Sequence, residues 1–177
     1  MKKSTKIAVC GMCTALSVVL MFVGGLLYVF TYVVPMLMGI VMAMINKTFG
    51  RSSALTIYFA TTVLSLLLVS EKECVLMYAL FFGYYPVIRP YLDKIKSKVG
   101  RVIVKFVIFN VAVALVEILS VYVFGIPFFD GETASYWLVI VFAVAMNIIF
   151  LMYEYVLKNF LKIYEVKIEP KVKKLFK

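Results

Sequence analysis

The sequence predicts an all-α, polytopic integral membrane protein, folded as one bundle of six transmembrane helices with both termini in the cytoplasm. The chain of 177 residues is 64% hydrophobic and 16% charged, and its mean hydropathy is +1.03. Long apolar runs recur from Ile7 to Leu161. Continuous runs of this kind disfavour a β-barrel, whose strands alternate over short segments. The length leaves room for one bundle and no separate soluble domain.

Turn signals and charges divide the apolar runs into six spans. The first run is too long for one helix and is divided near Gly24 and Pro35. The predicted spans are about 5–26, 32–46, 52–69, 74–88, 102–124 and 136–161, and a basic tail follows at 162–177. The fourth span is short for a bilayer, and Pro86 and Pro90 predict a kink or a stop within it.

The distribution of charge predicts the orientation. The N-terminus, the loops after spans two and four, and the tail carry nearly every Lys and Arg, whereas the opposite loops carry only Lys72 beside several acids. The positive-inside rule therefore places both ends in the cytoplasm. The basic stretch from Arg89 to Arg101 is expected to be an amphipathic segment at the membrane surface. Because topology accounts for the net charge of +10, no nucleic-acid partner is expected.

The fifth span carries the strongest candidate for a functional residue. Asn110 and Glu117 are seven residues apart, so both lie on one helical face. If the helix enters the bilayer near Arg101, Glu117 lies about 24 Å along it, in the outer half. No basic residue is expected at that depth. Glu117 is thus either a protonated carboxyl bonded to a neighbour or an ionised group that faces an outward cavity and binds a cationic or donor-rich ligand.

The sixth span predicts partners for the other polar residues of span five. Asn147 and Glu154 are also seven residues apart. If the two spans pack antiparallel, Lys105 and Glu154 form an ion pair, and Asn110 and Asn147 meet near the middle of the membrane. We interpret this layer as contacts that hold the bundle together; the alternative for Lys105 is that it extends to the interface.

Enzymatic and metal chemistry have little support in the sequence. The chain has no histidine, no G-x-S-x-G, no phosphate-binding P-loop and no tight cluster of carboxylates. Cys10 and Cys13 form a C-x-x-C within the first span, but no histidine or second cysteine pair completes a zinc site. We expect no enzymatic activity, no cofactor and no metal. Energy for any transport would come from a partner or an ion gradient.

These features resemble the substrate-binding S components of energy-coupling factor (ECF) transporters, small membrane proteins that capture vitamins and related micronutrients. The resemblance covers most of the chain: a basic N-terminus leading into Lys6–Leu16, six spans with both ends inside, a basic loop after span four, and the Asn of Ala143–Asn147. In that family a small-x-x-x-small motif on helix one docks against a transmembrane coupling protein. The matching positions are Gly11 and Ala15, with glycine where the family usually has alanine.

The resemblance implies a small-molecule micronutrient as the substrate, bound in the outer half among the later helices. The substrate contacts that it implies are Glu117, Asn147, Asn110, Tyr122 and Trp137, with Asp130 and Glu132 in a possible lid. It also implies a coupling protein and two cytoplasmic ATPases as partners, and the plasma membrane of a bacterium as the location. No motif matches binders of riboflavin, thiamine, biotin or folate, so the substrate stays open. The basic inner surface suits anionic lipid headgroups.

Two other classes of function fit the sequence. One is a non-transport membrane scaffold, such as the cell-shape protein MreD, which resembles S components in size and number of spans. The other is an autonomous ion-coupled carrier in which Glu117 or Glu154 takes up and releases protons. A scaffold should tolerate loss of the Glu117 charge, and a carrier should transport without an ATPase partner.

Overall fold

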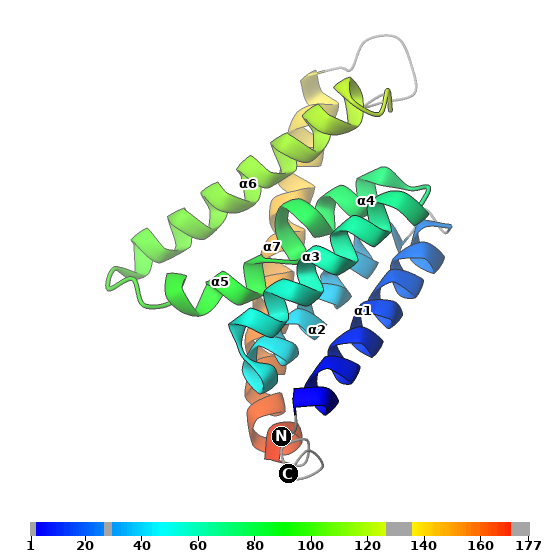
Figure 1. Cartoon of the computed structure of the whole chain (residues 1–177). Coiled ribbons are helices and arrows are strands. Elements are labelled where there is room, and N and C mark those ends of the chain that lie inside the picture. The colour runs from blue at the N-terminus through cyan, green and yellow to red at the C-terminus, as the bar shows by residue number, and fades with distance from the viewer. Residues whose placement is uncertain (1–2, 27–29, 127–135, 171–177) are drawn as a thin grey trace.

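Figure 1 shows a computed structural model of the chain, which describes residues 3–26, 30–126 and 136–170. Within these ranges the regular structure is helical throughout, with no strand, as the sequence predicted. The elements are α1 (Lys3–Gly25), α2 (Val33–Phe49), α3 (Arg51–Leu68), α4 (Lys72–Met77), η2 (Tyr78–Phe82), α5 (Tyr85–Leu92), α6 (Lys98–Tyr122), α7 (Tyr136–Ile163) and η3 (Tyr164–Ile168).

Among the described residues, four helices are long and apolar enough to cross a membrane, and they span Lys6–Gly25, Arg51–Leu68, Lys98–Tyr122 and Trp137–Ile168. A fifth apolar helix, α2, is shorter. Each of these five helices lies close to a predicted span. The last one continues through η3, so the predicted basic tail begins as helix. The first turn of α1 and the end of η3 lie at the same end of the bundle (Figure 1).

The fourth predicted span is the centre of the bundle. It consists of three short pieces, α4, η2 and α5, and α2 packs beside all three while also contacting α1, α3 and α7. In the segment from α4 to α5, the side chains that are at most 1% exposed are Cys74, Val75, Met77, Tyr78, Phe81, Phe82, Tyr85 and Val87. Because protein surrounds this segment, it does not need the length of a lipid-facing helix.

A wide turn interrupts this central segment at η2. The Gly83 amide donates to Tyr78 O at 2.7 Å, a bond across five residues, and the Tyr58 hydroxyl donates to Ala79 O at 2.7 Å. A side chain from α3 therefore satisfies a carbonyl at the point where the regular helical pattern is interrupted. Pro86 then lies in the first turn of α5, where a missing amide hydrogen costs little.

The basic stretch from Arg89 to Arg101, expected to be an amphipathic segment, is not one helix. α5 ends at Leu92, a turn follows, and α6 begins at Lys98. The Ser97 hydroxyl accepts a hydrogen bond from the Gly100 amide at 3.1 Å, so Ser97 is the N-cap of α6. The cap starts a new helix directly after the basic turn.

Aromatic side chains attach α6 and α7 to the central segment. Phe81 of η2 stacks on Tyr85 with ring centroids 4.5 Å apart and meets Phe109 of α6 edge-on at 5.0 Å. Phe109 in turn stacks on Phe150 of α7 at 4.7 Å. The two long helices cross in an X, and their far ends project beyond the other helices (Figure 1). The buried side chains of α6 lie from Lys105 to Ser120, and those of α7 lie from Met146 to Leu157.

A close approach at Gly39 yields a test of this packing. A Cβ added to Gly39 would lie 2.9 Å from Phe82 O and would also collide with the Tyr153 hydroxyl, whereas a Cβ added to Gly11 meets nothing within 4 Å. We predict that Gly39→Ala lowers the stability of the protein by about 1–3 kcal/mol through overpacking. Thermal unfolding in detergent checks this, with Gly11→Ala as the matched control. Equal melting temperatures for the two variants would contradict the packing around α2.

Candidate functional site

Glu117 lies half-buried on α6, beside the start of α4. Glu73 is in the first turn of α4, and Tyr32 immediately precedes α2. The Tyr32 hydroxyl donates a hydrogen bond to the Glu73 carboxylate. The charges of Glu73, Glu117 and Glu71 all act on this hydroxyl. The structure therefore gathers three carboxylates and one phenol where α2, α4 and α6 meet, at the end predicted to face outward.

The electrostatics of this outer acidic cluster (Tyr32, Glu71, Glu73 and Glu117) favour a ligand that donates hydrogen bonds. Burial raises the pKa of the Tyr32 hydroxyl, and the hydrogen bond to Glu73 raises it further, so Tyr32 stays a donor at neutral pH. Burial and the charge of Glu73 raise the pKa of the Glu71 carboxyl, against a smaller lowering by a backbone hydrogen bond. Both shifts follow from negative charge gathered in a partly buried place.

No cation neutralises Glu117 within the described part of the chain. Lys72 is adjacent in sequence to the acids, but its ammonium group donates to Leu66 O at 2.9 Å and to Val69 O at 2.6 Å. Lys72 thus satisfies carbonyls at the end of α3. Among the described residues, no hydrogen bond or ion pair links Glu117 to another side chain. One turn further on, the buried Ser120 hydroxyl also lacks a partner among the described residues.

The other predicted substrate contacts that the structure describes do not form a site with Glu117. Asn110 and Asn147 hydrogen-bond to each other, Nδ2 to Oδ1 at 2.9 Å and 3.0 Å. The second amide hydrogen of each goes to a carbonyl of its own helix, at 2.8 Å in both cases. The pair therefore has no donor left for a substrate. Tyr122 and Trp137 are 84% and 74% exposed, as side chains at a membrane interface would be.

Asp130 and Glu132, the residues of the predicted lid, lie outside the described residues. The sequence analysis did not assign Tyr32, Glu71 or Glu73 to the site. Their spacing from Glu117 along the chain gives no local signal, because packing of α4 against α6 brings them together.

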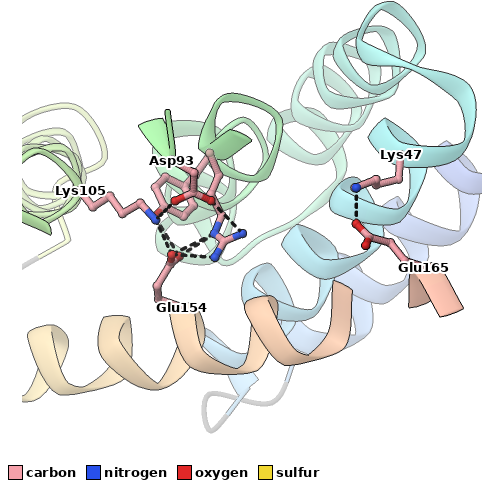
Figure 2. A network of polar contacts seen from close by, with 7 residues as sticks. Lys47, Asp93, Lys105, Glu154 and Glu165 are labelled. Atoms are coloured by element: carbon pink, nitrogen blue, oxygen red, sulfur yellow. Dashed lines mark hydrogen bonds and ion pairs between the residues drawn. The ribbon is translucent and has the colours of Figure 1, made fainter. Parts of the chain in front are cut away.

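A second group of charges lies between α5, α6 and α7, around Glu154 (Figure 2). Lys105 Nζ lies 2.5 Å from the Glu154 carboxylate, so the predicted contact is present. Arg89 Nε donates to both carboxylate oxygens, at 2.9 Å and 3.0 Å, and the Tyr85 hydroxyl donates at 3.0 Å. Asp93 completes the group, 2.7 Å from Lys105 Nζ and 3.4 Å from Arg89.

This buried ionic network (Arg89, Asp93, Lys105 and Glu154) is balanced, with two cations and two carboxylates. Arg89 is 8% exposed and Lys105 is 6% exposed, so each depends on its partners for stabilisation. The network fixes how α6 and α7 cross against α5, in agreement with the interpretation as a contact layer. Arg89 and Asp93 were not predicted as members, although their i,i+4 spacing on a helix was a usable signal.

Gly11 and Ala15 lie on an open face, in a groove between α1 and α3. Both are exposed, and a Cβ added to Gly11 would meet nothing within 4 Å. The groove has a volume of about 630 Å³ and is lined by Lys6, Ile7, Cys10, Gly11, Thr14, Ala15, Ser52, Ser53, Thr56, Ile57, Ala60 and Leu64. Its hydroxyls bond to carbonyls four residues earlier: Thr14 at 3.0 Å, Ser53 at 3.1 Å and Thr56 at 3.0 Å.

Comparisons with protein families, curated proteins and solved structures find no match for this chain. Within the described residues, no group of three or more His, Cys, Asp or Glu is arranged to hold a metal ion. The fold defines a class, an all-helical protein whose long apolar helices are typical of membrane proteins. Its function has to be argued from the residues at the two ends of the bundle and from the groove on α1.

The ionic network gives a stability prediction. Glu154→Gln keeps the shape of the side chain but leaves the buried Arg89 and Lys105 with only Asp93 as a counter-charge. We predict a loss of about 3 kcal/mol of stability, since removing one partner of a buried ion pair leaves an uncompensated charge. The control is Glu165→Gln, because Glu165 pairs with Lys47 where both side chains are more than 40% exposed. The control should cost under about 1 kcal/mol.

Unfolding of both variants by a denaturing detergent measures the difference. If Glu154→Gln were as stable as Glu165→Gln, the network would not hold α5, α6 and α7 together.

Proposed function

We propose that this chain is the substrate-capture subunit of a micronutrient uptake transporter, an S component of the ECF type. In this proposal the chain crosses the plasma membrane of a bacterium six times, with both termini inside. It binds a vitamin or vitamin precursor from outside and then docks on an ATPase-driven coupling protein. The observation that carries the proposal is Glu117, a half-buried carboxylate beside Glu73 and Tyr32 that no cation among the described residues balances.

The chemistry of the outer acidic cluster defines the class of substrate. The carboxylates of Glu73 and Glu117 are hydrogen-bond acceptors for a ligand. Charge-assisted hydrogen bonds from N–H groups to carboxylates are about twice as strong as neutral ones. Tyr32 is already engaged with Glu73, so it positions that carboxylate. The buried Ser120 hydroxyl, one turn from Glu117, has no hydrogen-bond partner within the described part of the chain. A protonated amine, or a ring with several N–H donors, fits this arrangement best.

The groove between α1 and α3 supports the docking step. Small side chains let another helix approach closely, and the groove hydroxyls already bond within their own helices. A surface of small side chains, three of whose hydroxyls are already bonded within the described residues, suits an apolar helix. Because a Cβ at Gly11 would meet nothing within 4 Å, space for the partner exists without rearrangement of the bundle.

The carrier alternative gains less support from the contacts. Glu154 is bonded to Arg89, Lys105 and Tyr85, so its proton exchange would break the ionic network. Only Glu117 is left as a proton site. The scaffold alternative leaves the unbalanced charge at Glu117 without a role. Uptake by this chain alone into proteoliposomes under a pH gradient would favour the carrier over the S component.

The ligand test uses the stability of the purified chain in detergent against a panel of vitamins and precursors. A ligand at a hundred times its dissociation constant should add about 2.7 kcal/mol, because it binds only the folded form. We predict that a cationic or donor-rich compound raises the melting temperature, and that Glu117→Gln abolishes the shift. Glu165→Gln, an acid at the opposite end, should keep it. No shift with any compound would favour the scaffold.

The docking test fills the groove. Gly11→Leu places a bulky side chain where the structure leaves open space, so the folded chain should keep its melting temperature while its association with the coupling protein is lost. Co-purification from native membranes measures the association. The control is Met12→Leu, because Met12 is 72% exposed and does not line the groove. Undiminished co-purification of Gly11→Leu would exclude this groove as the docking surface.

A further inference from the structure

A cavity of about 580 Å³ opens at the basic end of the bundle, beyond the ionic network. Its volume falls within the range of about 300–1,000 Å³ that is typical of small-molecule sites. Side chains from α2, the α5 end, α6, α7 and η3 line it: Lys47, Arg89, Pro90, Asp93, Arg101, Lys105, Glu154, Lys158, Leu161, Lys162 and Glu165. Six of these residues are cations and three are carboxylates.

All three carboxylates of the cavity are already paired. Glu154 and Asp93 balance Arg89 and Lys105 within the ionic network. Glu165 pairs with Lys47, so that α2 and η3 close one wall of the cavity (Figure 2). The remaining lining cations are Arg101, Lys158 and Lys162. No ion pair is found for any of the three within the described part of the chain.

Arg101 shows that this charge is held in place. Its Nη2 donates to Ile95 O at 3.1 Å, which ties the guanidinium to the turn before α6. Its Nε is buried and has no hydrogen-bond partner among the described residues. A buried guanidinium donor without a partner is costly, and an acceptor in the cavity would relieve that cost. Lys158 and Lys162 lie one turn apart on α7, on the face that lines the same cavity.

We propose that this cavity binds a phosphate group that carries net negative charge, held by Arg101, Lys158 and Lys162. The phosphate belongs to an anionic phospholipid headgroup or to a free phosphate compound, since both present the same acceptor oxygens. Arg is suited to phosphate oxygens through its planar set of donors, and the two lysines add point charges. The site does not depend on the proposed micronutrient, because Glu117 lies at the other end of α6.

The test measures binding to the purified full-length chain in a zwitterionic detergent. Three probes are titrated separately: short-chain phosphatidylglycerol, phosphatidylcholine with the same acyl chains, and inorganic pyrophosphate. Native mass spectrometry counts the bound molecules, and thermal stability reports the affinity. We expect saturable binding of phosphatidylglycerol or pyrophosphate and at least about tenfold weaker binding of phosphatidylcholine. Binding of phosphatidylglycerol alone identifies a lipid headgroup as the source, and binding of pyrophosphate identifies a free phosphate compound.

The variants localise the binding. Arg101→Gln combined with Lys158→Gln and Lys162→Gln should weaken it at least about tenfold, because three positive charges are removed from the cavity. The control replaces Lys94, Lys96 and Lys98 by Gln, which removes the same charge outside the cavity. Arg101 also holds the turn before α6, so a second variant changes only the exposed Lys158 and Lys162 to Gln. Its matched control changes only Lys96 and Lys98 to Gln.

Retention of binding in both cavity variants would overturn the proposal. An equal loss in the control variants would also overturn it, because the binding would then follow total charge. Equal binding of phosphatidylcholine would show that the acyl chains, and not the charge of the headgroup, are recognised.

Discussion

The bundle depends on the four charges of the buried ionic network. Two cations with less than one-tenth of their surface exposed would be strongly destabilising alone, and they are tolerated because two carboxylates lie within bonding distance. These contacts come from three helices, and an aromatic core lies against them. Apolar packing alone permits neighbouring registers of two crossing helices. An ion pair with fixed partners permits only one register, so the network determines where α6 and α7 cross.

The two ends of the protein have opposite electrical character for a physical reason. At one end, the acids gather around Tyr32 while the neighbouring lysine caps a helix, so negative charge is left over. At the other end every lining carboxylate is used in an ion pair, so positive charge is left over. The balanced network lines the basic end itself, so the excess positive charge there comes from the other lining cations. Each end therefore attracts a different class of molecule: donors at the acidic end and phosphate oxygens at the basic end.

Much of the fold followed from the sequence, because hydropathy and proline positions are local signals. The apolar runs placed the helices within a few residues, and Pro90 stands two residues before the end of α5. Antiparallel packing of spans five and six predicted both contacts, Lys105 with Glu154 and Asn110 with Asn147, because it places the residues of each pair at a similar depth.

Other features could not be predicted, since they depend on long-range packing. Nothing local showed that Glu73 would lie beside Glu117, or that Arg89 would reach Glu154. The sequence also did not show that the fourth span would be the most buried segment. Buried and lipid-facing helices are both apolar, so composition does not separate them. Only the shortness of this segment and its prolines pointed to a different environment.

The enclosed position of this central segment has a consequence for how the protein is made. From α4 to α5 the chain carries a wide turn, two prolines and Arg89, and it is interrupted before it could cross hydrocarbon as one regular helix. Such a backbone is stable at membrane depth only inside protein, where Tyr58 and Glu154 satisfy its polar groups. In a bilayer, such a segment would be stable only together with the helices on both sides. We therefore expect assembly of the bundle to be a condition for its integration.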